Sequence, residues 1–235
     1  MKIFRIKYMY CPIILIAVML FQNCGDKESN CIINPGNIVE TFMDIDSNIY
    51  HGVKIGNQIW MMENLRTTRY RNGDTIPNVI NNIQWVQEKN GGYCHYGNNI
   101  QNSITYGNLY NWFAVNDPRN LAPIGWHIPT NSEFFILTKY LGGFDVAVGK
   151  LKECGLDHWQ SPNTGGTNET SFTALPGGLR FDGIFFDIGI HGYWWTSTEI
   201  DTSWSQDFNL YYIKTAPFGT LSTKDQGLSI RCVKD

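Results

Sequence analysis

The sequence predicts an α+β domain with two main short helices and a twisted antiparallel sheet joined by long loops. Helix signals lie before residue 145, whereas strand and turn signals dominate after about residue 170. A group of helices followed by a run of antiparallel strands is typical of the α+β class. The late strands are rich in aromatic residues, which favour pleated, half-buried surfaces.

Order is expected from about Tyr50. Segments 50–55 and 58–62 are typical of a β-hairpin around Gly56-Asn57, because glycine and asparagine accept the positive φ values of a two-residue loop. Segment 108–115 places apolar side chains at roughly helical spacing and predicts a short helix.

The clearest helix follows Pro129. Thr130 and Glu133 have the spacing of a capping box, in which each residue satisfies a backbone N–H of the other. The apolar stripe behind them ends at Gly142-Gly143, a pair that stops helices.

The remaining elements are predicted strands. Asp182-Gly183 is a strong hairpin turn between 179–181 and 184–186. Three further segments are bounded by Gly, Pro and Asp and are expected to be strands: 193–198, 205–213 and 228–233.

The N-terminus predicts export and lipidation. Three basic residues precede the apolar run Ile13–Phe21, which is too short to span a bilayer and is typical of an export signal. Cys24 follows and resembles the acylated cysteine of bacterial lipoproteins. We therefore expect a lipoprotein signal at 1–23, a flexible tether at 24–48 and a domain at 49–235. The alternatives are an uncleaved signal anchor and a differently cut secretory peptide.

The net charge argues against two kinds of polyanionic partner. The signal holds three of the 18 basic residues and no acidic one, so the remaining chain carries a net charge of −6. Nucleic acids and anionic membrane surfaces require a basic face, so neither is an expected partner.

Four cysteines remain after the signal and the lipidated residue: Cys31, Cys94, Cys154 and Cys232. None forms a Cys-x-x-Cys pair, and in an oxidising compartment they allow three disulfide pairings. A structural disulfide is expected, with a free thiol at Cys154 as the alternative.

Six sequence blocks in a fixed order resemble the Fibrobacter succinogenes major paralogous domain family, as found in lipoproteins of Bacteroidetes. The blocks are 53–65, 106–112, 125–130, 172–178, 192–199 and 230–233. Many members have a Cys-Pro pair before the Gly-Trp-His element, where this chain has Ala122-Pro123. The family is similar to the C-type-lectin-like superfamily that includes formylglycine-generating enzymes. The resemblance implies an α+β domain with neighbouring termini.

The sequence predicts neither an enzyme nor a metal or cofactor. The oxidase chemistry of the superfamily uses two neighbouring cysteines near the C-terminus, but only Cys232 follows Cys154 here. The five histidines lack metal-ligand spacing, and His127 is expected to be a hydrogen-bonded core residue. Glu199 and its acidic neighbours are expected to be solvated loop carboxylates, and a calcium site built from them is the alternative.

Adjacent aromatic pairs are the candidate binding residues: Trp194, Trp195, Tyr211 and Tyr212. Neighbouring strand residues face opposite ways, so one ring of each pair is either covered by another element or exposed to stack on a sugar. The Asn- and Gly-rich segment 90–103 would frame such a site or form a long loop.

Together these patterns predict an envelope lipoprotein at the outer membrane or cell surface. Its expected role is non-catalytic binding or adhesion, with a glycan or an envelope protein as partner. An envelope-polymer hydrolase and a structural subunit of a surface assembly or pilus are the alternatives.

Overall fold

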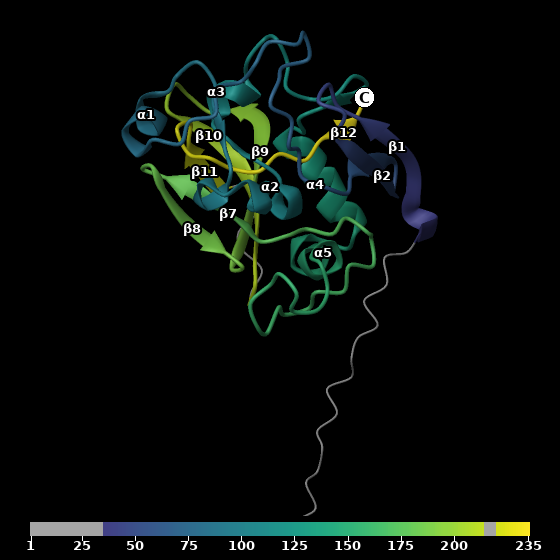
Figure 1. Ribbon diagram of the computed structural model, residues 1–235. Helices are drawn as coiled ribbons and strands as arrows, with labels where there is room; N and C mark the ends of the chain where they lie inside the picture. The colour runs from purple at the N-terminus through teal and green to yellow at the C-terminus, as the bar shows by residue number, and fades with distance from the viewer. Residues whose placement is uncertain (1–34, 214–219) are drawn as a thin grey trace, which may run out of the picture.

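The computed structural model describes residues 35–213 and 220–235, and these form a mixed α/β fold dominated by sheet. Two curled five-stranded sheets, mostly antiparallel, make up most of the fold (Figure 1). A two-stranded ladder adds β4 (Tyr93–Cys94) and β5 (Leu109–Tyr110). The predicted signal, Cys24 and Cys31 lie outside the described residues.

The first sheet has the order β1-β2-β3-β12-β6. Its strands are β1 (Ile38–Met43), β2 (Ile49–Ile55), β3 (Gln58–Met61), β12 (Val233–Lys234) and β6 (Trp126–His127). The β2–β3 hairpin confirms the predicted turn, with Gly56 at φ 62°.

The expected tether at 24–48 is wrong from Pro35 onward. A short 3-10 helix, Pro35–Asn37, leads into β1, which pairs antiparallel with β2. Alternate β1 side chains turn inward, and the Phe42 ring stacks on Trp126 at 4.1 Å between centroids. Burial of these side chains adds a strand that the polar composition of the segment concealed.

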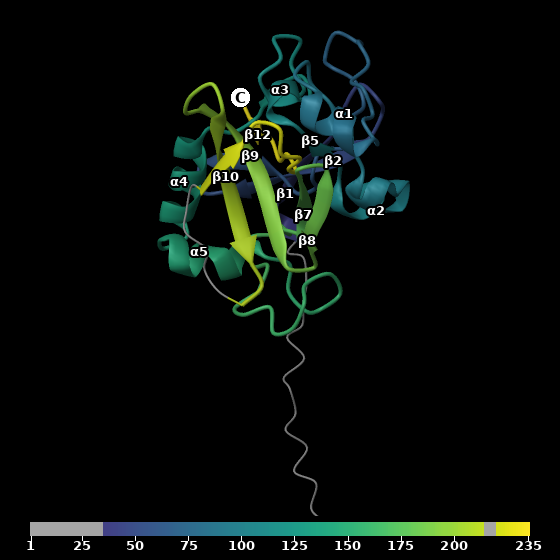
Figure 2. The same cartoon turned by 90° about the vertical axis from the view of Figure 1, so that its left-hand side faces the viewer.

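The second sheet has the order β11-β10-β9-β7-β8. Figure 2 shows its strands β10, β9, β7 and β8. Its strands are β7 (Gly177–Phe181), β8 (Ile184–Ile188), β9 (His191–Glu199), β10 (Trp204–Tyr211) and β11 (Thr220–Thr223). The β7–β8 hairpin is confirmed, and both Asp182 and Gly183 have positive φ.

The predicted strand 228–233 is largely wrong. Leu228 and Ser229 make isolated bridges to two different partners, Tyr110 and Trp194, and only Val233–Lys234 joins a ladder. The segment passes between the two sheets, so its hydrogen bonds are divided among neighbours instead of forming one pairing.

Five α-helices lie in the described residues, against two expected. They are α1 (Asn82–Gln87), α2 (Ile100–Tyr106), α3 (Trp112–Val115), α4 (Asn131–Tyr140) and α5 (Phe144–Leu151). The predicted helix 108–115 begins only at Trp112, because Leu109 and Tyr110 pair with β4 and Asn111 caps the helix.

Helix α4 has the predicted capping box between Thr130 and Glu133. Glu133 also accepts a hydrogen bond from His127 Nε2 at 2.8 Å, and Asp235 lies 2.8 Å from Nδ1. Burial lowers the pKa of His127, but the two carboxylates outweigh it and leave the pKa raised. His127 is therefore a half-exposed link between α4 and the chain end, and not the core residue expected.

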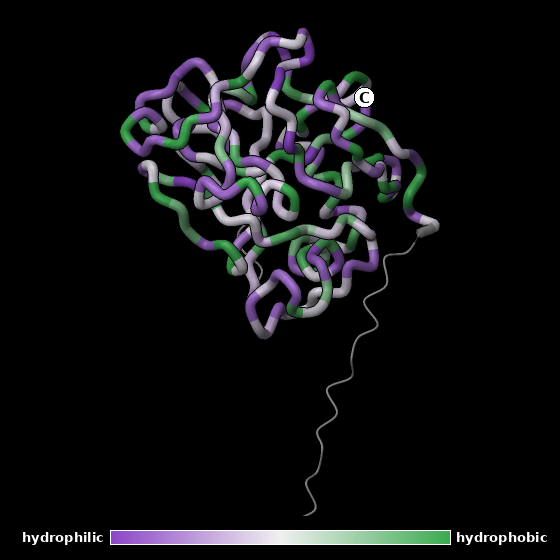
Figure 3. Tube along the Cα trace, in the orientation of Figure 1, coloured by the Kyte–Doolittle hydropathy of each residue, from purple (hydrophilic) through white to green (hydrophobic). Residues whose placement is uncertain are grey.

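Two large clusters of buried side chains lie on either side of β9. One cluster joins β2, α3 and the segment 228–232, and the other joins β3, α4, α5 and β10. Figure 3 shows that hydrophobic residues also reach the periphery at α1 and β8. There Ile83, Ile184 and Phe186 are exposed.

A fully buried arginine links several of these elements. The Arg231 guanidinium donates to Asn64 Oδ1 from Nε (3.0 Å) and Nη2 (2.7 Å), and to the carbonyls of Phe172 and Thr173. Asn64 Oδ1 also accepts from Trp194 Nε1, and the Phe172 ring lies 4.3 Å beneath the guanidinium carbon. Burial lowers the pKa of Arg231 to about 9.

The two ends of the domain are neighbours, as the resemblance implied. Lys234 in β12 places Nζ 2.5 Å from Oε2 of Glu40 in β1.

Cys154 is disulfide-bonded, so the free-thiol alternative for this residue is wrong. Cys94 and Cys232 are buried free thiols. Among the described residues, no helix combines the length and apolarity that a membrane crossing requires.

Replacing Arg231 tests its structural role. We expect Arg231→Met to lower the free energy of unfolding by about 3 kcal/mol or more, because the carbonyls of Phe172 and Thr173 lose their donor and Asn64 Oδ1 keeps only the hydrogen bond from Trp194. Urea titration followed by near-UV circular dichroism measures the change. Arg69→Gln is the matched control, since its exposed ion pair with Asp46 is expected to contribute about 1 kcal/mol or less. Equal losses in both variants would contradict this role.

Candidate functional site

A polar pocket of about 520 Å³ joins three segments distant in sequence. The β1–β2 connection contributes Asp46 and Asn48, the loop after β3 contributes Arg66 and Thr68, and the third segment runs from the end of β4 to the start of β5. The third group of lining residues consists of His95, Ile100, Ser103, Ile104 and Asn108.

The buried amide of Asn108 organises the pocket. Its Nδ2 donates to the carbonyl of Arg66 at 3.0 Å, which fixes the orientation of the amide. Its Oδ1 then accepts from Ser103 Oγ at 2.6 Å and lies 3.0 Å from His95 Nδ1. The preceding Gly107 has φ 78°, and a Cβ there would lie 2.6 Å from that of Asn64, so only glycine brings Asn108 into place.

This geometry assigns the tautomer of a neutral His95. Because Asn108 Oδ1 is an acceptor, Nδ1 of His95 must carry the proton, which leaves Nε2 as an acceptor. Among the described residues, the His95 ring forms a hydrogen bond with Asn108 and with no other residue. His95 is a buried residue that lines the pocket, and its Nε2 keeps a lone pair able to accept a hydrogen bond.

Helix α2 supplies both polar and apolar parts of the wall. Asn99 caps the helix by accepting from the N–H of Gln101. Ser103 faces inward and is buried, whereas Ile100 and Ile104, one turn apart, are 55 % and 62 % exposed. The pocket therefore combines hydrogen-bonding groups with an aliphatic flank.

The carboxylate oxygens of Asp46 already accept hydrogen bonds from neighbouring residues. Its Oδ2 accepts from Thr67 Oγ1 and from both the N–H and the hydroxyl of Thr68, at 2.5–3.2 Å. Its Oδ1 lies 3.3 Å from Arg69 Nε. The carboxylate therefore shapes the pocket rim, and its lone pairs are largely used.

Trp194 and Trp195 are not ligand platforms, which corrects the sequence-based prediction. Both side chains are 0 % exposed and lie in different hydrophobic clusters. Trp194 Nε1 donates to Asn64 and Trp195 Nε1 donates to the carbonyl of Tyr110. Strand β9 is covered on both faces, so neighbouring side chains that point in opposite directions are both buried.

Tyr211 and Tyr212 are half-buried and lie apart from the tryptophans. The Tyr211 ring stacks on His191 at 4.2 Å, and Tyr212 meets it edge-on at 4.8 Å. Beneath them, the buried Lys152 ammonium donates to the carbonyls of both tyrosines and of Thr164. Burial lowers the pKa of Lys152 to about 8. These two rings remain a secondary candidate surface.

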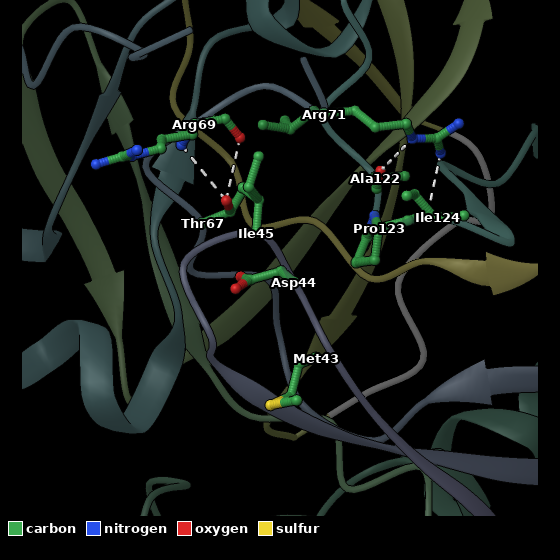
Figure 4. Close-up of a pocket in the computed structure, with 10 residues that line it drawn as sticks. Met43, Asp44, Ile45, Thr67, Arg69, Arg71, Ala122, Pro123 and Ile124 are labelled. Atoms are coloured by element: carbon green, nitrogen blue, oxygen red, sulfur yellow. Dashed lines mark hydrogen bonds between the residues drawn. The ribbon is translucent and has the colours of Figure 1, made fainter. Parts of the chain in front are cut away.

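A second, smaller pocket of about 190 Å³ is mainly apolar (Figure 4). Its walls include Met43 and Ile45 on one side and Pro123 and Ile124 on the other. Arg71 turns its guanidinium back onto the carbonyls of its own wall, including that of Pro123 at 2.9 Å. This pocket offers volume for an apolar group but few free hydrogen-bonding groups.

Residues 53–234 match the Fibrobacter succinogenes major domain. The chain belongs to this family. No curated protein and no solved structure gives a significant match to the chain. The family match includes the parts of the polar pocket contributed by Arg66, Thr68 and the segment from His95 to Asn108.

Sequence reasoning located part of the pocket and missed the rest. Segment 90–103 was identified as a possible frame, and it does contribute His95, Ile100 and Ser103. Asp46, Arg66 and Asn108 carry no shared spacing, because tertiary packing alone brings them together. The one local feature beside Asn108 is Gly107, whose φ of 78° and tight packing require glycine.

The His95 tautomer is directly testable. We expect long-range ¹H–¹⁵N correlation spectra to show the Nδ1–H form of neutral His95, because Asn108 Oδ1 accepts that proton. Asn108→Leu removes the acceptor and is expected to shift the ring toward the Nε2–H form. A wild-type spectrum showing Nε2–H would contradict the proposed geometry.

Proposed function

We propose that the chain is an exported cell-envelope lipoprotein whose domain binds glycan without performing chemistry. The arrangement of His95, Ser103 and Asn108 in a polar pocket is the observation that carries the binding role. We place the protein at the outer membrane or cell surface, with a C-type-lectin-like fold as the finer description of its domain. Its membrane contact is the lipid anchor.

The pocket has the chemical features that sugars require. Sugar hydroxyls both donate and accept hydrogen bonds, and His95 Nε2 supplies an acceptor while Arg66 and Asn48 supply donors. The C–H faces of a sugar ring are apolar, and Ile100 and Ile104 provide a matching flank. Ligand sites generally combine such apolar surface with a few oriented polar groups.

The pocket favours binding over hydrolysis. Most glycoside hydrolases use two carboxyl groups that flank the scissile bond. Of the described residues that line this pocket, Asp46 alone carries a carboxyl group, and its oxygens already accept several hydrogen bonds.

A role in a surface assembly is the second candidate. Strand β8 lies at the edge of its sheet and exposes Ile184 and Phe186 on one face, next to the exposed ring of Phe181. Unpaired sheet edges with apolar side chains support strand addition by another chain. Concentration-dependent self-association that Ile184→Lys abolishes would favour this role.

Two substitutions at His95 separate binding from folding. The Asn side chain in His95→Asn can keep a donor near the position of Nδ1 but removes Nε2, whereas Gln in His95→Gln extends toward the Nε2 position. We expect His95→Asn to weaken glycan binding about tenfold, the value of one hydrogen bond of about 1.4 kcal/mol, and His95→Gln to weaken it less. Glycan arrays followed by titration calorimetry measure the affinities. Equal affinity of wild type and His95→Asn would remove the pocket from the proposal.

Anchoring is tested separately at Cys24. We expect Cys24→Ser to move the protein from the membrane fraction to the soluble fraction, because the acyl chains supply the membrane affinity. Cys94→Ser, at a thiol that the structure leaves free, is the matched control and is expected to stay with the membrane. Mass spectrometry of the wild-type product should show an acylated Cys24 at the amino end, and an unmodified start would contradict the anchor.

A further inference from the structure

Arg66 is the positively charged residue of the polar pocket, and most of its N–H donors are unused. It lines the pocket, and its Nη2 makes one long contact of 3.5 Å with the carbonyl of Ile49. Its Nε is buried and has no hydrogen-bond partner among the described residues. In residues 35–213 and 220–235, no carboxylate oxygen lies within 4.0 Å of the Arg66 guanidinium. Four of its five N–H groups therefore lack an acceptor in the described part of the chain.

Other arginines of the fold are much better satisfied. Arg71 donates to three carbonyls, and Arg180 donates to three carbonyls and the side chain of Asn82. Arg119 pairs with both Asp74 and Asp117. Against this pattern, an arginine with a single weak acceptor at the wall of a pocket has the capacity to bind an anion.

The charges around the pocket also favour an anion. Asp46 is the other charged lining residue, and it is paired with Arg69 and bound by three further donors. The Arg66 charge is therefore not cancelled within the pocket. The Tyr50 ring, 5.8 Å from the guanidinium carbon, supports it from one side.

We propose that the glycan bound in this pocket carries a carboxylate, as in a uronic acid, and that Arg66 binds this group. A guanidinium matches a carboxylate through two parallel N–H···O hydrogen bonds, which are stronger than hydrogen bonds between neutral groups. The sugar hydroxyls then lie toward His95 and Ser103, at the other part of the lining. This inference rests on the proposed glycan-binding function.

The test uses a glycan array that displays neutral, carboxylated and sulfated oligosaccharides, probed with the soluble domain in its wild-type, Arg66→Gln, Arg66→Lys and Arg119→Gln forms. We expect wild type to bind a carboxylated glycan about tenfold more tightly than its neutral counterpart. Arg66→Gln should lose this preference while retaining weak binding, and Arg66→Lys should keep part of it. Arg119→Gln carries the same charge change away from the pocket and should behave as wild type.

Thermal unfolding of each variant confirms that it is folded before binding is compared. Equal binding of neutral and carboxylated glycans by wild type, or an unchanged preference in Arg66→Gln, overturns the assignment of Arg66 but leaves the glycan-binding role standing. Preference for sulfated over carboxylated glycans overturns the carboxylate assignment. Absence of binding to every glycan overturns both this inference and the function on which it rests.

Discussion

The Arg231 guanidinium is the interaction on which the rest of the fold depends. It connects the loop after β3, the loop before β7, strand β9 and its own C-terminal segment through a single buried cation. Asn64 is the shared acceptor, receiving hydrogen bonds from both Arg231 and Trp194. These contacts unite four of the sequence blocks that carry the family resemblance, all of which lie within the matched residues 53–234.

The fold repeatedly stabilises buried ions with dipoles in place of opposite charges. Arg231, Arg180 and Lys152 are all fully buried, and their donors bond to carbonyl or amide oxygens. The carboxylate of Asp207 is likewise buried and accepts from neutral hydroxyl and amide groups, and burial raises its pKa. Because each such ion requires several oriented partners, each one fixes the loops that supply them. Arg66 differs from these ions, because it is only partly buried, lines a pocket and has a single long hydrogen bond in the described part of the chain.

The sequence was most informative where structure is decided locally. The hairpin turns at Gly56 and Asp182-Gly183 and the capping box of Thr130 follow from the conformations and hydrogen bonds of a few adjacent residues. For the tryptophans of β9 the sequence left both covered and exposed rings open, because their burial depends on elements that cover the strand from both sides. The structure has the covered alternative. The polar pocket was only partly predictable for the same reason, since Asn108 meets His95 and Arg66 through tertiary packing.

The adjacency of Glu40 in β1 and Lys234 in β12 means that the domain enters and leaves its fold at one place. Such a unit can be spliced into an exposed loop of a host polypeptide without stretching either flank, or be circularly permuted with a short linker. The domain can therefore be inserted by recombination into different multidomain proteins as one folding unit.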